Sequence, residues 1–278
     1  MLYVFLVLAL LASCALTWAA SGFATLHALW QVPVFFAGSF LALVLLFLLV
    51  VLISCLFVDP KKLLEKPSGY FRFLLNEFCR LALALGGVHV NVTGLEKVPR
   101  DSRFLLVSNH RFAFDPLVFY SSMPWADLAF LSKKENFSIF VVAQIMRKVL
   151  CLPVDRNNDR ESLKSILKAI QFLKEDKCSI VVFPEGGTNR TEEDLLPFRN
   201  GAFKIAQKAH VPIVICALVN SKAILKNMFR RHTDVYLDVL AVIPPEELEG
   251  LKTVDIGDRA HGILLEGLRK RKATLATQ

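Results

Sequence analysis

The chain has 278 residues, enough for one sizeable globular core, and 54% of them are hydrophobic, with a mean hydropathy of +0.46. This composition excludes a purely soluble protein, so part of the chain is expected to lie in lipid. The formal net charge of +8 favours an anionic membrane surface or anionic substrates as partners. Nucleic acid is the competing partner, but no binding motif supports it and a membrane anchor argues against it.

The charged residues divide the chain. Residues 1–58 contain no Asp, Glu, Lys or Arg, so all 33 basic and 25 acidic residues fall in residues 59–278. We therefore predict a transmembrane anchor over residues 1–58, an amphipathic linker helix within residues 59–87, and a cytoplasmic catalytic domain over residues 88–278.

Two apolar runs make up the anchor. Residues 33–58 would form a helix about 39 Å long, which spans roughly 30 Å of hydrocarbon with some tilt. Residues 1–20 are apolar too, and they lack the positive n-region of a secretory signal, so a second span is favoured over a cleaved signal. Basic residues follow the second run directly, and the positive-inside rule predicts a cell-membrane protein whose globular part lies in the cytoplasm. They are Lys61, Lys62, Lys66 and Arg72.

The pattern of residues 69–85 predicts an amphipathic helix, which ends at Gly86 and Gly87. Two interpretations stay open: the helix lies along the bilayer interface, or it packs on the core of the domain. Its apolar positions recur at spacings of three and four: Phe71, Leu74, Leu75, Phe78, Leu81, Ala82 and Leu85.

Short β-rich runs alternate with helical patterns in the rest of the chain. This alternation predicts an α/β domain with a largely parallel or mixed sheet flanked by helices. One of the helices, residues 160–175, carries a leucine and isoleucine stripe that we expect in the core. The predicted strands are residues 88–92, 104–108, 128–131, 152–155, 179–183, 212–219 and 235–243.

The first candidate catalytic segment is Asn109–Pro116, which directly follows a predicted strand. Ligands of α/β sheets bind at the carboxyl ends of strands. His110 and Asp115, five residues apart, can meet across the turn that opens the next helix. The carboxylate would then fix the imidazole tautomer and leave the other ring nitrogen free to act as a general base. A capping Asp beside a core His is the alternative.

A second segment, residues 181–190, runs from a buried-strand pattern into a loop of small residues. The loop contains Gly186, Gly187 and Arg190. Such a loop brings backbone N–H groups and a guanidinium toward one anion, as a phosphate requires. Arg156 follows another predicted strand in the same way.

In this order, and after an apolar anchor, these segments resemble the glycerolipid acyltransferase family, to which the 1-acyl-sn-glycerol-3-phosphate acyltransferases (PlsC-like) belong. The family shows N-H-x-S-x-x-D, a hydrophobic run ending F-[IV]-x-R, F-P-E-G-T-R-S and a V-P-[IV] strand, and the resemblance covers about residues 85 to 220. By position it implies His110 and Asp115 as the catalytic pair. It further implies acceptor phosphate near Arg156 of the second block and near Glu185 and Gly186 of the third.

The third block departs from the family pattern. Gly187 stands where the family has Thr, and Thr188 stands where it has Arg. A guanidinium reaches several ångströms, so Arg190 is expected to supply the missing charge, with Arg199 as the alternative.

The resemblance implies transfer of an acyl group from acyl-CoA or acyl carrier protein to a lysophosphatidic-acid-like acceptor, giving phosphatidic acid in phospholipid synthesis. Acylation of glycerol-3-phosphate or another lysolipid, and a non-catalytic lipid-binding protein, remain alternatives. No cofactor and no metal site are expected. The six cysteines show no C-x-x-C spacing, and the other histidines show no ligand spacing. Those histidines are His27, His89, His210, His232 and His261.

Overall fold

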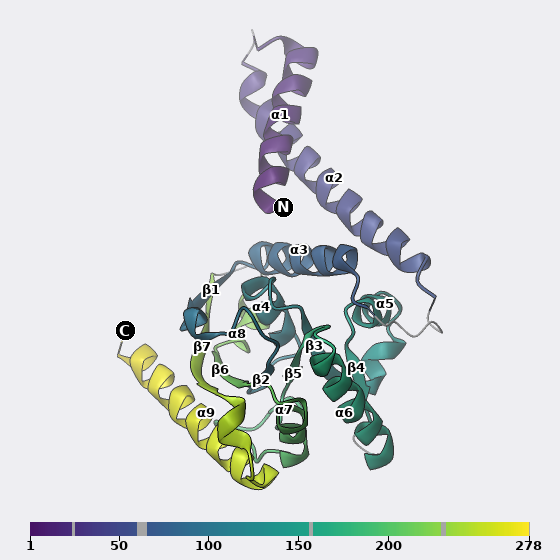
Figure 1. Cartoon of the computed structure of the whole chain (residues 1–278). Helices are drawn as coiled ribbons and strands as arrows, with labels where there is room; N and C mark the ends of the chain where they lie inside the picture. The colour runs from purple at the N-terminus through teal and green to yellow at the C-terminus, as the bar shows by residue number, and fades with distance from the viewer. Residues whose placement is uncertain (24–25, 60–65, 156–157, 229–231, 278) are drawn as a thin grey trace. The chain divides into compact units, whose positions relative to one another are not determined.

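The computed structural model describes residues 1–23, 26–59, 66–155, 158–228 and 232–277. The chain divides into two compact units, Met1–Asp59 and Pro60–Gln278. The first unit is helical, and the second contains a sheet of seven strands with helices on both faces (Figure 1).

The first unit consists of α1 (Leu2–Ser21) and α2 (Ala28–Leu56), both long and apolar enough to cross a membrane. The second helix begins at Ala28, so the prediction that it starts at Pro33 is wrong. Pro33 lies in the second turn of the helix, where it removes the hydrogen bond to the carbonyl of Leu29 and its ring crowds that carbonyl. The helix therefore continues through Pro33, although a proline in the sequence suggests the start of a helix.

Small residues line the contact between the two helices. Ala9, Ser13 and Thr17 are spaced by four residues and are buried, which lets the backbones approach closely. Phe5 and Phe47 meet edge to face, with ring centroids 6.3 Å apart. These contacts explain why α1 and α2 form a hairpin.

The second unit is built on a sheet in the order β1-β7-β6-β2-β5-β3-β4. Among the described strand pairs, β6 and β7 are antiparallel and the others are parallel. The predicted mixed α/β sheet is confirmed, and each predicted strand is present to within two residues at either end. The strands are β1 (Val88–Thr93), β2 (Leu105–Ser108), β3 (Leu128–Lys133), β4 (Leu152–Val154), β5 (Ser179–Val182), β6 (Ile213–Val219) and β7 (Thr233–Ile243).

The central strands β2, β5 and β6 are buried along their whole length. Helices cover both faces of this part of the sheet, so its strands are continuous apolar runs. In Figure 1, α3 and α4 lie above the sheet, and α6, α7 and α9 lie below it. The helices are α3 (Gly69–Leu85), α4 (Asp115–Ser122), α5 (Phe140–Lys148), α6 (Asp159–Lys174), α7 (Lys204–Ala209), α8 (Ala223–Asn227) and α9 (Thr253–Ala276).

Helix α3 has the bounds that the sequence predicts and is capped by Ser68, whose Oγ accepts from the backbone N–H of Phe71. Its apolar face packs into the second unit, where Phe71 and Leu74 are buried. Tyr70 and Phe73 stay more than half exposed. The helix therefore packs on the domain and also presents aromatic rings outward.

Arg72 does not flank the anchor as a free cation. It is buried, and its guanidinium donates to the backbone carbonyls of Leu128 and Val149 and pairs with Asp127. A buried cation needs such partners, and here they tie α3 to β3 and α5. Lys61 and Lys62 lie outside the described residues.

The stripe predicted as core on α6 is only partly buried. Leu173 is buried, but Leu163 and Leu167 are 49% and 58% exposed. Ala169 and Phe172 are buried in the core together with Leu173, and Ser165 donates to the carbonyl of Pro153 on β4. Ile166 and Ile170 are partly buried against the same core, so the part of the predicted stripe that faces outward is Leu163 and Leu167.

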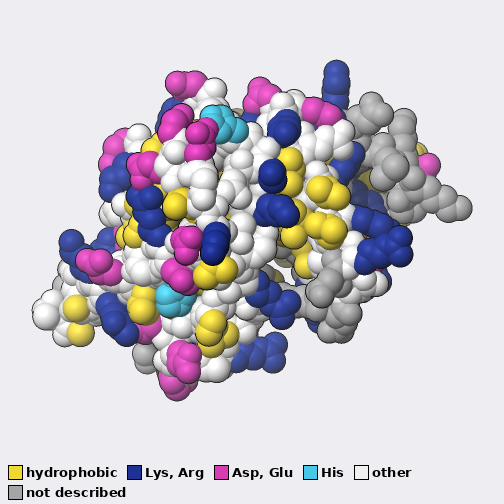
Figure 2. All heavy atoms as spheres, turned by 60° about the horizontal axis from the view of Figure 1, so that its bottom comes forward, with side chains coloured by type: hydrophobic (Ala, Val, Ile, Leu, Met, Phe, Trp, Pro, Cys, Tyr) yellow, Lys and Arg dark blue, Asp and Glu magenta, His cyan; other side chains and the backbone are white. Residues whose placement is uncertain are grey.

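Figure 2 shows the molecule turned so that the bottom of Figure 1 comes forward. Acidic and basic side chains are interspersed there, with small hydrophobic patches between them. On this face the net positive charge is therefore not gathered into one basic stripe.

Candidate active site

The candidate site begins where β2 ends. Asn109 follows Ser108 and is buried, and its side-chain amide donates to the carbonyl of Leu218 and accepts from the N–H of Leu218, both at 2.8 Å. The amide thus continues the β2–β6 pairing by one residue. This fixes the chain direction before His110.

His110 and Asp115 are in contact, as their spacing predicts. Nδ1 of His110 lies 2.9 Å from Oδ2 of Asp115, which is fully buried at the first position of α4. The same oxygen accepts from the backbone N–H groups of Arg111 and Phe112, at 2.8 and 3.0 Å. Three donors on one oxygen hold the carboxylate in a single orientation.

The imidazole of His110 is also held from one face. It stacks on Phe183, which follows β5, with centroids 4.2 Å apart and planes within 9° of parallel. The side chain is 15% exposed, and Nε2 makes no hydrogen bond to any residue that the structure describes. With Nδ1 engaged by Asp115, Nε2 is the nitrogen available to a substrate proton.

Glu185 connects the two motifs. Its Oε1 accepts from the backbone N–H of His110 at 2.7 Å, and its Oε2 accepts from the N–H of Leu196 at 3.0 Å. Burial raises the pKa of this carboxyl, and the two N–H donors oppose the rise. Both oxygens face protein donors, which favours a positioning role over the phosphate contact that the sequence predicts.

Gly186 adopts a left-handed conformation, with φ of +73°, and Arg199 runs directly past it. A Cβ at residue 186 would lie 2.4 Å from Nε of Arg199 and 2.7 Å from its Cδ. The backbone N–H of Arg199 also donates to the carbonyl of Pro184 at 2.8 Å. The backbone angle favours glycine here, and any side chain at this position would displace the Arg199 guanidinium.

The other predicted phosphate ligands are placed less tightly. Arg190 is exposed, and its guanidinium makes no hydrogen bond or ion pair to a described residue. Gly187 and Thr188 lie in the same loop and are half-buried. Arg156 lies outside the described residues. The structure thus brings Arg199, the sequence alternative, against the third block.

Two residues that the sequence analysis passed over hold this loop. Asn189 is fully buried and donates its backbone N–H to the carbonyl of His110 at 2.7 Å. Arg111 donates to the carbonyls of Glu193 and Thr191 at 2.7 and 3.1 Å. Both lie inside the motifs, but only the folded loop shows that their partners are main-chain atoms.

His89 and His232, which show no ligand spacing in the sequence, lie close together in the fold. Their ring centroids are 5.9 Å apart, although 142 residues separate them in the sequence. They come together because β1 pairs with β7. Sequence spacing cannot show ligands brought together across a sheet.

Comparison with known proteins identifies the family. The family model described as Acyltransferase matches residues 89–219. The 1-acyl-sn-glycerol-3-phosphate acyltransferase of Borreliella burgdorferi is 30% identical over 174 residues, covering 62% of this chain and 68% of the relative. The enzyme of that name from Bacillus subtilis is 33% identical over 146 residues, covering 51% and 69%.

A solved structure shares the fold. The 1-acyl-sn-glycerophosphate acyltransferase PlsC of Thermotoga maritima superposes with a TM-score of 0.62 at 21% identity, over 81% of this chain and 88% of that one. The mixed sheet is thus shared with a solved acyltransferase. The chain belongs to the acyltransferase family that contains the 1-acyl-sn-glycerol-3-phosphate acyltransferases.

Proposed function

We propose that this enzyme transfers a fatty acyl group from an acyl thioester to the free hydroxyl of 1-acyl-sn-glycerol-3-phosphate, giving phosphatidic acid. The 2.9 Å contact between His110 Nδ1 and Asp115 Oδ2 carries the proposal, since it leaves Nε2 open as a base. The acceptor is inferred from the names of the relatives, which are 1-acyl-sn-glycerol-3-phosphate acyltransferases. Membrane attachment suits it, because both acceptor and product reside in a bilayer.

In the proposed mechanism, Nε2 of His110 removes the proton of the acceptor hydroxyl as its oxygen attacks the thioester carbonyl. Asp115 orients the ring and stabilises the imidazolium that forms. The tetrahedral intermediate collapses with cleavage of the C–S bond, and His110 returns the proton to the departing thiolate. The acyl group ends on the acceptor oxygen, and His110 is neutral again.

The acceptor phosphate is assigned to the loop around Gly186. Arg199 lies against Gly186, and Arg190 is exposed on the same loop without a described partner. A guanidinium forms paired, charge-assisted hydrogen bonds to phosphate oxygens. Arg156 and the Gly186–Gly187 backbone, predicted from the family blocks, complete the proposed phosphate site.

The proposed location is the cell membrane, with the second unit on the cytoplasmic side. Two observations support it: the apolar helices α1 and α2, and the basic residues that follow them, Lys66 among the described ones. A cytoplasmic domain also meets acyl-CoA or acyl carrier protein, the two candidate donors.

The purified full-length protein, reconstituted in phospholipid vesicles, is the material for the test. Acyl-CoA and acyl carrier protein thioesters are each combined with 1-acyl-glycerol-3-phosphate, glycerol-3-phosphate and lysophosphatidylcholine. We expect the highest kcat/KM with 1-acyl-glycerol-3-phosphate. A higher value with another acceptor would reassign the substrate, and no transfer from either donor would favour a lipid-binding protein.

A further inference from the structure

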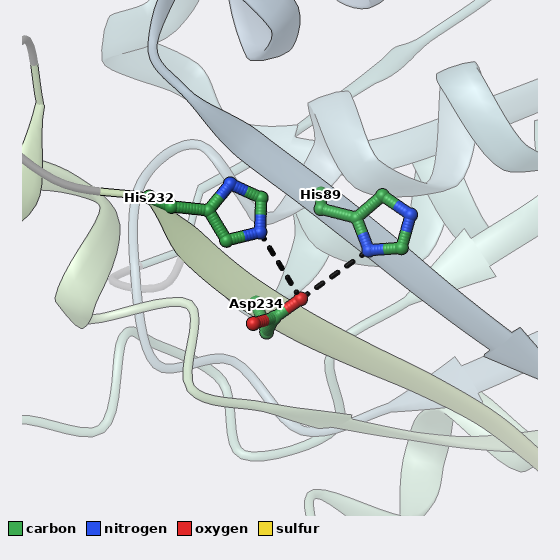
Figure 3. Close-up of side chains that lie close together, drawn as sticks. All are labelled: His89, His232 and Asp234. Carbon is green, nitrogen blue, oxygen red and sulfur yellow. Dashed lines mark hydrogen bonds and ion pairs between the residues drawn. The ribbon is translucent and has the colours of Figure 1, made fainter.

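Strands β1 and β7 begin side by side and place three metal-ligand side chains together. His89 on β1 is the register partner of Asp234 on β7. His232 lies just before β7, and its side chain reaches the carboxylate of Asp234. Figure 3 shows the two imidazole rings converging on the carboxylate.

The distances match the coordination shell of a small divalent cation. Nδ1 of His89 and Nε2 of His232 each lie 3.3 Å from Oδ1 of Asp234, and the three ligand atoms lie within 4.8 Å of one another. A tetrahedral ion with bonds of about 2.0 to 2.1 Å has neighbouring ligand atoms about 3.3 to 3.4 Å apart. Two edges of such a tetrahedron are therefore already in place.

Two neighbouring amides hold Asp234. Asn91, the next residue on the same face of β1, donates from Nδ2 to Oδ1 of Asp234 at 3.1 Å. Asn220 donates to the backbone carbonyl of Asp234 at 2.7 Å. Metal sites commonly have such supporting hydrogen bonds around their ligands.

The cluster is distinct from the candidate active site. Because β7 runs antiparallel to β6, and β6 parallel to β2, the start of β7 lies at the sheet edge where β2 ends. Strand β6 separates β7 from β2, and the cluster shares no residue with the His110 site. Its two histidines are exposed, so an ion can reach them from solvent.

We propose that His89, His232 and Asp234 bind one divalent cation of the zinc class, with water completing the shell. Two imidazoles and one carboxylate suit Zn²⁺, and an oxygen-seeking ion such as Mg²⁺ would not favour them. The ion would join β1, at the edge of the sheet, to β7. Binding to the folded state alone would stabilise the protein against unfolding.

The proposal is tested on the full-length, tag-free protein in detergent after removal of metal with a chelator. Zn²⁺ binding is measured by equilibrium dialysis with elemental analysis, and Co²⁺ is added as a spectroscopic probe of tetrahedral geometry. We expect one tightly bound Zn²⁺ per chain, a tetrahedral Co²⁺ spectrum and a higher Tm with Zn²⁺. Stoichiometry well below one, or an unchanged Tm, would overturn the proposal.

Single substitutions identify the ligands. His89→Ala and Asp234→Asn should each weaken Zn²⁺ binding by at least roughly 10-fold and abolish the Tm increase. The matched control is His210→Ala, since His210 is an exposed histidine whose one carboxylate neighbour, Glu249, is 3.8 Å away. Binding retained in the two ligand variants, or lost in His110→Ala instead, would place the ion elsewhere.

Discussion

The backbone N–H of His110 donates a 2.7 Å hydrogen bond to Oε1 of Glu185, so one carboxylate joins the segment after β2 to the loop after β5. The other carboxylate oxygen holds Leu196, farther along the same loop. Glu185 thereby fixes the backbone on which the proposed base is mounted. Its negative charge serves as an acceptor for main-chain donors, and the phosphate is left to the arginines.

We expect Glu185→Gln to destabilise the protein and to lower kcat. Glutamine offers one acceptor oxygen, so one of the two N–H groups would face an NH₂ group. Hydrogen bonds to charged groups contribute about 1.5 to 3 kcal/mol, which sets the expected loss in the free energy of unfolding. Chemical denaturation of the full-length protein in detergent, followed by tryptophan fluorescence, measures that loss.

The control for this variant is Glu192→Gln, an exposed carboxylate on the same loop. It should leave both stability and kcat close to the wild-type values. If Glu185→Gln instead raises the acceptor KM at unchanged stability, Glu185 contacts the substrate and the positioning role is wrong.

The raised pKa of Glu185 predicts a pH dependence of stability. In the unfolded chain the carboxyl titrates near 4.5, and burial raises its pKa in the folded protein. Between these two pKa values the folded state holds a proton that the unfolded state has lost, so this group's contribution to stability falls as pH rises. The stability difference between wild type and Glu185→Gln should therefore narrow from pH 4 upward. A difference that widens over this range would contradict the direction of the shift.

Much of the fold follows from sequence patterns. The seven strands and α3 were predictable because buried apolar runs and an amphipathic repeat determine them locally. The start of α2 and the exposed Leu163 on α6 were not, since they depend on how a proline is tolerated and on which helix face meets the sheet. Local sequence patterns determine where helices and strands form, whereas tertiary packing determines which side of each helix is buried.

Some contacts of the candidate site could also be predicted from sequence, and others could not. The contact between His110 and Asp115 is local, five residues across one turn, so spacing alone suggests it. The approach of Arg199 to Gly186 and the pairing of His89 with His232 depend on loop and sheet geometry. Contacts of that kind lie beyond what spacing can show.

Because Arg199 lies against Gly186, we expect Arg199 to be the main arginine that binds the acceptor phosphate. Arg199→Ala should raise the KM for 1-acyl-glycerol-3-phosphate roughly 10- to 150-fold, corresponding to about 1.5 to 3 kcal/mol for a charged hydrogen bond. The KM of the acyl donor should stay nearly constant. Arg190→Ala, on the same loop, is the comparison variant and should have the smaller effect.

A phosphate-free acceptor, monoacylglycerol, provides the control for both arginine variants. Its low rate of acylation should be the same in Arg199→Ala and in wild type. The role moves to Arg190 if that variant alone loses affinity for the phosphorylated acceptor. If neither variant does, Arg156 becomes the main candidate.

The open Nε2 of His110 predicts the largest effect on rate. His110→Ala should lower kcat by roughly 10² to 10⁴, the usual contribution of a general base, with little change in acceptor KM. Asp115→Asn should also lower kcat, because its amide can present an N–H to Nδ1 and favour the wrong tautomer. His210→Ala, a change at an exposed histidine, serves as the control and should keep wild-type activity. Acyl transfer at the wild-type rate by membrane-integrated His110→Ala would rule out this histidine as the base, whatever the acceptor.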